Sequence, residues 1–222
     1  MQLSLPHASC PQPESNRIAD ATAAGLVFHQ RGAEIYCGGQ TGEAWRIQQG
    51  SVRLDLHSGD QTRFAGVALA GDLIGVEVLL FGIYSYSARA LSEVILERWS
   101  DPVEQMSAPK LLHLVHGMER RSADSVALRS GAAETRIARL LGLMGRGLGL
   151  GKARVRVALP TLRDIADITG LTIETVSRTL KSLRHAGRLE MVGERRTREV
   201  WVQAGDGEPA LGDVLAGRDD PR

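Results

Sequence analysis

Four polar residues near the C-terminus are spaced so that one face of a helix would present them together. In the stretch GLTIETVSRTLKSLRHAGRL, residues 170–189, Val176, Leu180 and Leu183 recur at helical spacing and predict a buried face. Arginine can donate two hydrogen bonds to guanine, a carboxylate can accept one from the cytosine amino group, and serine can hydrogen-bond several bases. The pattern therefore predicts a helix that contacts base edges in the major groove of DNA. The opposite, polar face carries Glu174, Ser177, Arg178 and Lys181.

A second helix is predicted immediately before this one. Thr161 can cap the segment LRDIADIT, with Asp164 in the capping-box position. Gly170 is expected to end that helix and Thr172 to cap the next one. The two helices are then joined by a turn of about three residues, with the small Ala166 where they must approach each other. This is the signature of a helix-turn-helix.

The residues that follow predict a basic hairpin. The stretch LEMVGERRTREVWV, residues 189–202, reads as two strands that turn around Gly193, with Arg195, Arg196 and Arg198 near the tip. A basic hairpin beside such a helix is a wing that contacts the DNA backbone. We expect further backbone contacts from residues of the second helix, namely Thr172, Thr175, Lys181 and Arg184.

Positive charge is concentrated in this part of the chain. Residues 151–202 hold 11 Lys/Arg against 6 Asp/Glu, a net of +5, whereas residues 1–150 hold 14 against 15, a net of −1. The alternative, that Glu174 and Arg178 only form a solvated ion pair four residues apart, explains neither this charge nor the turn spacing nor the hairpin. We therefore expect double-stranded DNA to be the partner.

The first half of the chain has a different character. From residue 31 to about residue 99, short apolar runs are separated by glycine, which favours an antiparallel β-sandwich or barrel. In the run GSVRLDLHSGD the apolar and polar residues alternate, which predicts one buried and one wet face. The apolar set is Val52, Leu54 and Leu56, and the polar set is Arg53, Asp55 and His57.

A long helix is predicted between the two halves, over residues 106–130. One seam keeps alternating steps of four and three, the spacing of a helix that packs along a partner helix, and it predicts dimerisation. The seam becomes small and polar toward its C-terminal end, so a self-contained amphipathic helix is the alternative. The seam residues are Leu111, Val115, Met118, Ser122 and Ser125.

These features together resemble the CRP/FNR family of bacterial transcription regulators. The resemblance covers about residues 20–202, and the motif LTIETVSR at 171–178 is specific to the family. It implies an α+β chain: a β-roll sensor with a jelly roll like the cyclic-nucleotide-binding domain at 1–105, a dimerisation helix at 106–130, and a winged helix-turn-helix at 131–202. It also implies a homodimer that binds palindromic DNA and RNA polymerase. The tail, residues 203–222, is expected to be disordered.

Within the family, Glu-x-x-Ser-Arg is the FNR-like version of the recognition helix and is associated with TTGA-type half-sites. The resemblance implies that Arg178 contacts the half-site guanine, Glu174 the cytosine opposite or adjacent, and Ser177 a neighbouring thymine. Leu162 stands where relatives often have a phosphate-contacting arginine. That contact is therefore not carried over to this chain.

The signal that the β-roll would sense is not identified by the sequence. In the stretch GDLIGVEVLLFGIYSYSARAL, Tyr86 and Ser87 stand where the cAMP-binding branch has an arginine and its partner. Without that arginine a cyclic phosphate loses its charged partner, which argues against cAMP. Arg89 lies close by, so a cAMP-type ligand-gated regulator is the alternative to an unknown effector or to none. The expected effector pocket comprises Gly71, Asp72, Gly75, Tyr86, Ser87 and Arg89.

Few residues suit a cofactor. The two cysteines, Cys10 and Cys37, cannot hold an iron–sulfur cluster or zinc within one chain, and Cys37 is expected to be a buried residue rather than a redox-sensitive thiol. Haem binding is not excluded, because four histidines could serve as axial ligands of the iron. The two histidines on the long helix could instead bind a metal together or belong to a polar helix face. The four candidate histidines are His29, His57, His113 and His116.

The competing function from another class is a cupin-like metalloenzyme. Its metal site needs closely spaced histidines on neighbouring strands, and the β-region offers only His29 and His57. We therefore expect a regulator rather than an enzyme. The most apolar stretch, residues 66–83, contains Asp72 and Glu77, and the N-terminus lacks the pattern of a secretory signal. We expect a cytoplasmic protein that does not enter a membrane.

Overall fold

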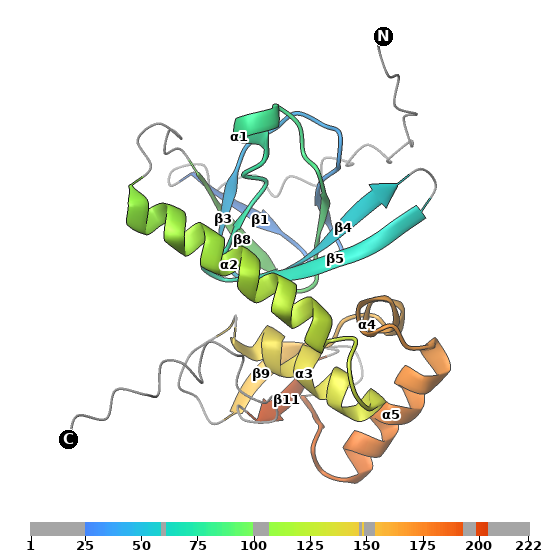
Figure 1. The fold of residues 1–222 in the computed structure, drawn as a ribbon. Coiled ribbons are helices and arrows are strands. Elements are labelled where there is room, and N and C mark those ends of the chain that lie inside the picture. The colour runs from blue at the N-terminus through green and yellow to red at the C-terminus, as the bar shows by residue number, and fades with distance from the viewer. Residues whose placement is uncertain are drawn as a thin grey trace, which may run out of the picture.

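The computed structural model describes residues 25–58, 61–99, 107–146, 148, 154–192 and 199–203. Two four-stranded antiparallel sheets come first, followed by a long helix and then by three shorter helices with a small three-stranded sheet (Figure 1). The predicted α+β class is confirmed. The residues outside these ranges include the predicted hairpin tip with Arg195 and Arg196, as well as Cys10 and the C-terminal tail.

The two large sheets form the β-roll. Their strand orders are β1-β8-β3-β6 and β2-β7-β4-β5. The strands are β1 Leu26–His29, β2 Glu34–Tyr36, β3 Trp45–Gln49, β4 Ser51–Ser58, β5 Gln61–Leu69, β6 Leu73–Ile74, β7 Ser87–Ala90 and β8 Val94–Arg98, with a short helix, α1, at Val78–Phe81.

The interior of the β-roll is filled by side chains from both sheets. On β7, Ala88 and Ala90 point into this core, and on β4, Val52 does the same. The rings of Tyr36 and Tyr84 stack at a centroid separation of 3.8 Å. Alternate residues of each strand therefore face outward, which places Arg53 and Arg89 on the outer surface of the second sheet.

Helix α2, Ala108–Ala127, begins with Pro109 in its first turn and lies along one side of the β-roll (Figure 1). The helix lies close to β5: the Ser125 hydroxyl donates a hydrogen bond to the carbonyl of Ala65 at 3.1 Å. The residue beside that carbonyl is Gly66, where an added Cβ would lie 3.3 Å from the Ser125 oxygen. A glycine at this position lets the helix pack against the strand.

The C-terminal part contains the predicted helix-turn-helix, followed by the two strands of the predicted hairpin. Helix α3 buries one apolar face, and the small sheet has the order β10-β11-β9. The elements are α3 Ala133–Arg146, β9 Arg154–Ala158, α4 Leu162–Thr169, α5 Ile173–His185, β10 Glu190–Val192 and β11 Glu199–Gln203.

The C-terminal helices share a hydrophobic core with one side of the β-roll. Val67, Leu69 and Leu91 of the β-roll belong to the same buried cluster as Leu128, which follows α2, and Ile165 of α4. The outer face of β4 is covered as a result, and here the sequence prediction was wrong. Arg53 and Asp55 were predicted to be wet, but they are buried because α4 lies over them. Leu56, near the uncovered end of the strand, is 41% exposed instead.

Gly170 fixes the turn between α4 and α5. Its backbone is left-handed, with φ +66°, and its N–H donates to the carbonyl of Ala166. Gly170→Ala should lower the free energy of unfolding by about 1–2 kcal/mol, because a Cβ is disfavoured in this conformation. The control is Gly38→Ala, where the added Cβ meets nothing closer than 3.5 Å. Urea unfolding measures both variants, and equal stability of Gly170→Ala and wild type would contradict the prediction.

Candidate nucleic-acid interface

Helix α5 is held by its apolar face. Val176, Leu180 and Leu183 are buried in the core that α3 and α4 contribute to, as predicted. The start of the helix is fixed by Thr172, whose hydroxyl accepts a hydrogen bond from the N–H of Thr175 at 3.2 Å. The polar face is open to solvent, with Ser177 half-buried and the charged residues exposed. All the predicted base-contacting residues therefore lie on this one helix. The exposed charged residues are Glu174, Arg178, Lys181 and Arg184.

Helix α4 is capped at both ends. The Thr161 hydroxyl accepts from the N–H of Asp164 at 3.0 Å, which is the predicted cap, and it donates to the Asp164 carboxylate at 2.6 Å, whereas a full capping box would bring that carboxylate to the Thr161 N–H. At the other end, Arg129 donates to the carbonyl of Asp167 and Arg136 to that of Thr169, both at 3.1 Å. Cations at a helix C-terminus are favourable, so these arginines fasten α4 to its neighbours.

The charge state of Glu174 suits the acceptor role that the sequence assigned to it. Hydrogen bonds from its own backbone N–H and from the Thr172 hydroxyl lower the pKa of Glu174, and the charge of Arg178 lowers it further. The carboxylate is therefore ionised near neutral pH and can accept a hydrogen bond from a base amino group.

Ile173, at the N-terminal end of α5, is an exposed residue that the sequence analysis did not consider. It opens α5 and is 46% exposed, next to Glu174. An exposed aliphatic side chain at this place can contact the methyl group of thymine. The sequence did contain a signal for this position. A residue directly after the cap Thr172 lies in the first turn of the helix, and the N-terminal residues of a recognition helix are those that contact base edges.

The residues of the predicted effector pocket make separate contacts in the structure, and the pocket itself stays a prediction. Asp72 forms an ion pair with Arg120 of α2, and the Ser87 hydroxyl accepts from the N–H of Gly38. Arg89 faces α4 because β7 alternates and its alanines fill the core. The small recess beside Gly71 and Asp72 measures about 10 Å³, too little for an effector.

A larger hollow lies between the β-roll and α2. Its volume is about 640 Å³, and among the predicted pocket residues only Tyr86 contributes to its wall. Leu54 and Phe64 line it from β4 and β5, and Met118 and Arg121 line it from α2. The hollow is mostly apolar at the strands and carries a charge at the helix.

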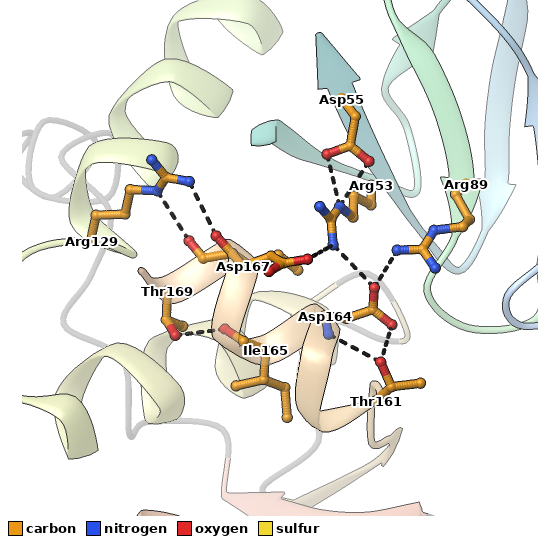
Figure 2. Close-up of polar contacts among 10 residues, drawn as sticks. Arg53, Asp55, Arg89, Arg129, Thr161, Asp164, Ile165, Asp167 and Thr169 are labelled. Carbon is orange, nitrogen blue, oxygen red and sulfur yellow. Dashed lines mark hydrogen bonds and ion pairs between the residues drawn. The ribbon is translucent and has the colours of Figure 1, made fainter. Parts of the chain in front are cut away.

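A cluster of charges joins the outer face of the β-roll to α4 (Figure 2). Arg53 donates to Asp164 at 3.1 Å and to Asp167 at 3.3 Å, and Arg89 pairs with Asp164 as well. Burial alone would raise the pKa of Asp164, but the Thr161 hydroxyl and the charges of Arg89 and Arg53 outweigh it, and the pKa falls below its ordinary value.

The predicted dimer seam lies on the open side of α2. Leu111, Val115, Met118 and Ser122 are exposed, whereas Ser125 faces the β-roll through its hydrogen bond to Ala65. Val126, one residue further on, is 67% exposed and continues the apolar seam in its place.

The histidines and Cys37 lie apart from these features. His29 is on β1 and His57 on β4, in different sheets, so the cupin-like site is not assembled. His113 and His116 are exposed on α2, and Cys37 is buried. Within the described ranges, no three metal-binding side chains gather at one point, and no helix there is long and apolar enough to cross a membrane.

Comparison with known proteins identifies the family. Residues 135–202 match the Crp-like helix-turn-helix domain. The nitrogen fixation regulation protein FixK of Azorhizobium caulinodans is 33% identical over 199 residues, which span 82% of this chain and 79% of that protein. The chain belongs to the CRP/FNR family. As a member of this family it is a DNA-binding transcription regulator.

Two further CRP/FNR relatives agree with this assignment. FixK of Bradyrhizobium diazoefficiens is 34% identical over 161 residues, 67% of this chain and 66% of that protein. The structure of FixK2 from Bradyrhizobium japonicum superimposes with a TM-score of 0.60 and 27% identity, over 89% of this chain and 98% of that one. The family resemblance seen in the sequence is confirmed.

The ion pairs of Asp164 predict a specific dependence of stability on pH. Because its pKa in the folded chain lies below the ordinary value of about 3.9, its stabilising contribution is complete above that value and is lost as the pH falls through the folded-state pKa. Wild type should therefore be more stable than Asp164→Asn at neutral pH, with a difference that shrinks below about pH 4. Urea unfolding at several pH values measures this, and a constant difference would contradict the prediction.

Proposed function

We propose that the protein is a homodimeric regulator that binds palindromic DNA with TTGA-like half-sites. The observation that carries the proposal is the exposed face of α5, which presents Glu174, Ser177 and Arg178 together while the apolar face is buried. In this proposal Arg178 donates to guanine, Glu174 accepts from the cytosine amino group, and Ser177 and Ile173 contact thymine.

The backbone contacts are assigned to the cations and hydroxyls around the same helix. Lys181 and Arg184 lie exposed on α5, and Thr172 and Thr175 stand at its N-terminal end, where backbone N–H groups and the helix dipole favour phosphate. Arg195 and Arg196, which lie outside the described residues and which the sequence predicts near the hairpin tip, complete the proposed set. Backbone contacts set the affinity and the register, whereas the base contacts set the specificity.

Dimerisation through α2 is supported by its exposed apolar residues. Leu111, Val115, Met118 and Val126 are open to solvent along one side of the helix, while its other side is fixed to the β-roll. A second copy would cover this seam and form a parallel coiled coil. The two recognition helices of the dimer would then face half-sites about 34–36 Å apart.

The β-roll is proposed to control DNA binding, either through an effector in the hollow next to α2 or without one. The cAMP-type alternative is less favoured, because Arg89, the residue that kept it open, pairs with Asp164. RNA polymerase is the proposed further partner, as in the family, and the cytoplasm, where bacterial DNA lies, is the proposed location. We propose no catalytic activity.

The base contacts are tested by Arg178→Ala. This variant should bind the preferred site about 1–3 kcal/mol more weakly and should tolerate other bases at one position of each half-site. Lys181→Ala is the contrasting variant, expected to weaken binding to all sequences alike and to reduce the salt dependence by about one phosphate contact. Selection from randomised duplexes gives the result, and an unchanged preference in Arg178→Ala would show that the base contacts are wrongly assigned.

The dimer is tested by Val115→Glu, which places a charge in the apolar seam. We expect the variant to sediment as a monomer and to lose binding to the palindrome, because a buried unpaired carboxylate costs several kcal/mol. His116→Glu is the matched control, one residue along α2 and about 100° around its axis, where the side chain is also exposed. If Val115→Glu remains a dimer, the interface lies elsewhere.

A further inference from the structure

Arg53 is a charged side chain buried where the β-roll meets the C-terminal helices. Its side chain is only 5% exposed. Its Nε lies 2.8 Å from Asp55 on the same strand, and its Nη1 donates to Asp164 and Asp167 on α4 (Figure 2). One guanidinium therefore connects a carboxylate of the β-roll with two carboxylates of the helix-turn-helix.

This charge cluster fixes the orientation of α4 more than it adds to the free energy of folding. Burying an ion pair costs hydration that its attraction only about repays, and apolar residues of similar size are often as stabilising. The guanidinium is planar, however, and its N–H groups point in fixed directions. The surrounding hydrophobic contacts do not have this property, because apolar burial is non-directional. Arg53 therefore restricts α4 to one orientation on β4.

The orientation of α4 determines that of α5. The C-terminal helices connect to α2 through the turn around Gly131, and Arg129 and Arg136 hold the C-terminal end of α4. The Arg53 cluster adds a polar attachment of α4 to β4, which pairs with β5, the strand that contacts α2. The polar face of α5 stays exposed in this arrangement, so the cluster does not act by covering that face.

We infer that Arg53 is a positioning residue for DNA binding, which acts through Asp164 and Asp167 to set the orientation of α5 relative to α2. The inference rests on the proposed dimer and palindrome, because a fixed orientation matters when two recognition helices must fit one duplex. Arg53 itself does not touch DNA.

The test is the affinity of full-length Arg53→Gln for the selected palindrome, measured by fluorescence anisotropy between about 50 and 200 mM salt. We expect the affinity to fall roughly 5- to 150-fold, the usual range for coupling between two parts of a protein. The slope of log affinity against log salt should equal that of wild type, because no phosphate contact is lost. Lys181→Gln, in comparison, should reduce that slope.

Two variants separate positioning from a general effect of charge or folding. Arg98→Gln removes the same charge from the β-roll at an exposed site paired with Glu43, and it should bind like wild type. Arg89→Gln loses one ion pair of a side chain that is 40% exposed, so it should fold even if Arg53→Gln does not. We expect a loss of about two- to fivefold for Arg89→Gln.

A double-mutant cycle identifies the partner through which Arg53 acts. If the effect passes through Asp164, Arg53→Gln combined with Asp164→Asn should bind about as weakly as the weaker single variant. Fully additive losses would overturn the inference, as would wild-type affinity in both Arg53→Gln and Arg89→Gln, or a salt slope reduced by about one. Failure of wild type to bind the palindrome would instead overturn the proposed site, and the positioning role with it.

Discussion

The guanidinium of Arg53 can be buried only if carboxylates accompany it, because an unpaired charge in the interior forfeits several kcal/mol of hydration. One of these carboxylates belongs to the next outward-facing residue of β4, Asp55. Another, Asp164, lies 111 residues further along the chain. The folded chain must therefore bring the β-roll and the first helix of the helix-turn-helix together at this point. The shared hydrophobic cluster then closes around the contact.

From that contact the structure extends outward to the face of α5 that is proposed to contact DNA. Helix α4 rests on β4 on one side and supports α5 on the other, so the side chains of Ile165 and Val176 lie in one core. The polar residues of α5 have no role in this packing and remain available. Structural and functional residues are thus separated onto opposite faces of the same short helix.

The helix-turn-helix could be predicted from the sequence because its signals are local. Thr161, Gly170 and Thr172 mark helix ends within a few residues of the apolar pattern they delimit, and all three act as predicted. The direction in which Arg89 points could not be predicted in this way. Arg89 is near the expected cavity along the chain, but strand alternation turns it to the other side of the sheet, toward α4.

The role of Arg53 was also beyond the reach of sequence pattern. An alternating strand shows which residues share a face, but a face that meets water and a face that meets oppositely charged groups have the same polar composition. Asp164 likewise had a sufficient local explanation as part of the capping box. Neither residue signals that the other is its partner, because their contact depends on how distant elements pack.

Because of the charge cluster, neither half of this protein could simply be replaced by the corresponding half of a relative. A β-roll that carries Arg53 presents a cation whose partners beyond its own strand are the carboxylates at positions 164 and 167 of the helix-turn-helix. A change on one side of the contact would leave the buried charge on the other side short of a partner. The β-roll and the helix-turn-helix are therefore matched to each other in this chain, even though each has a recognisable fold of its own.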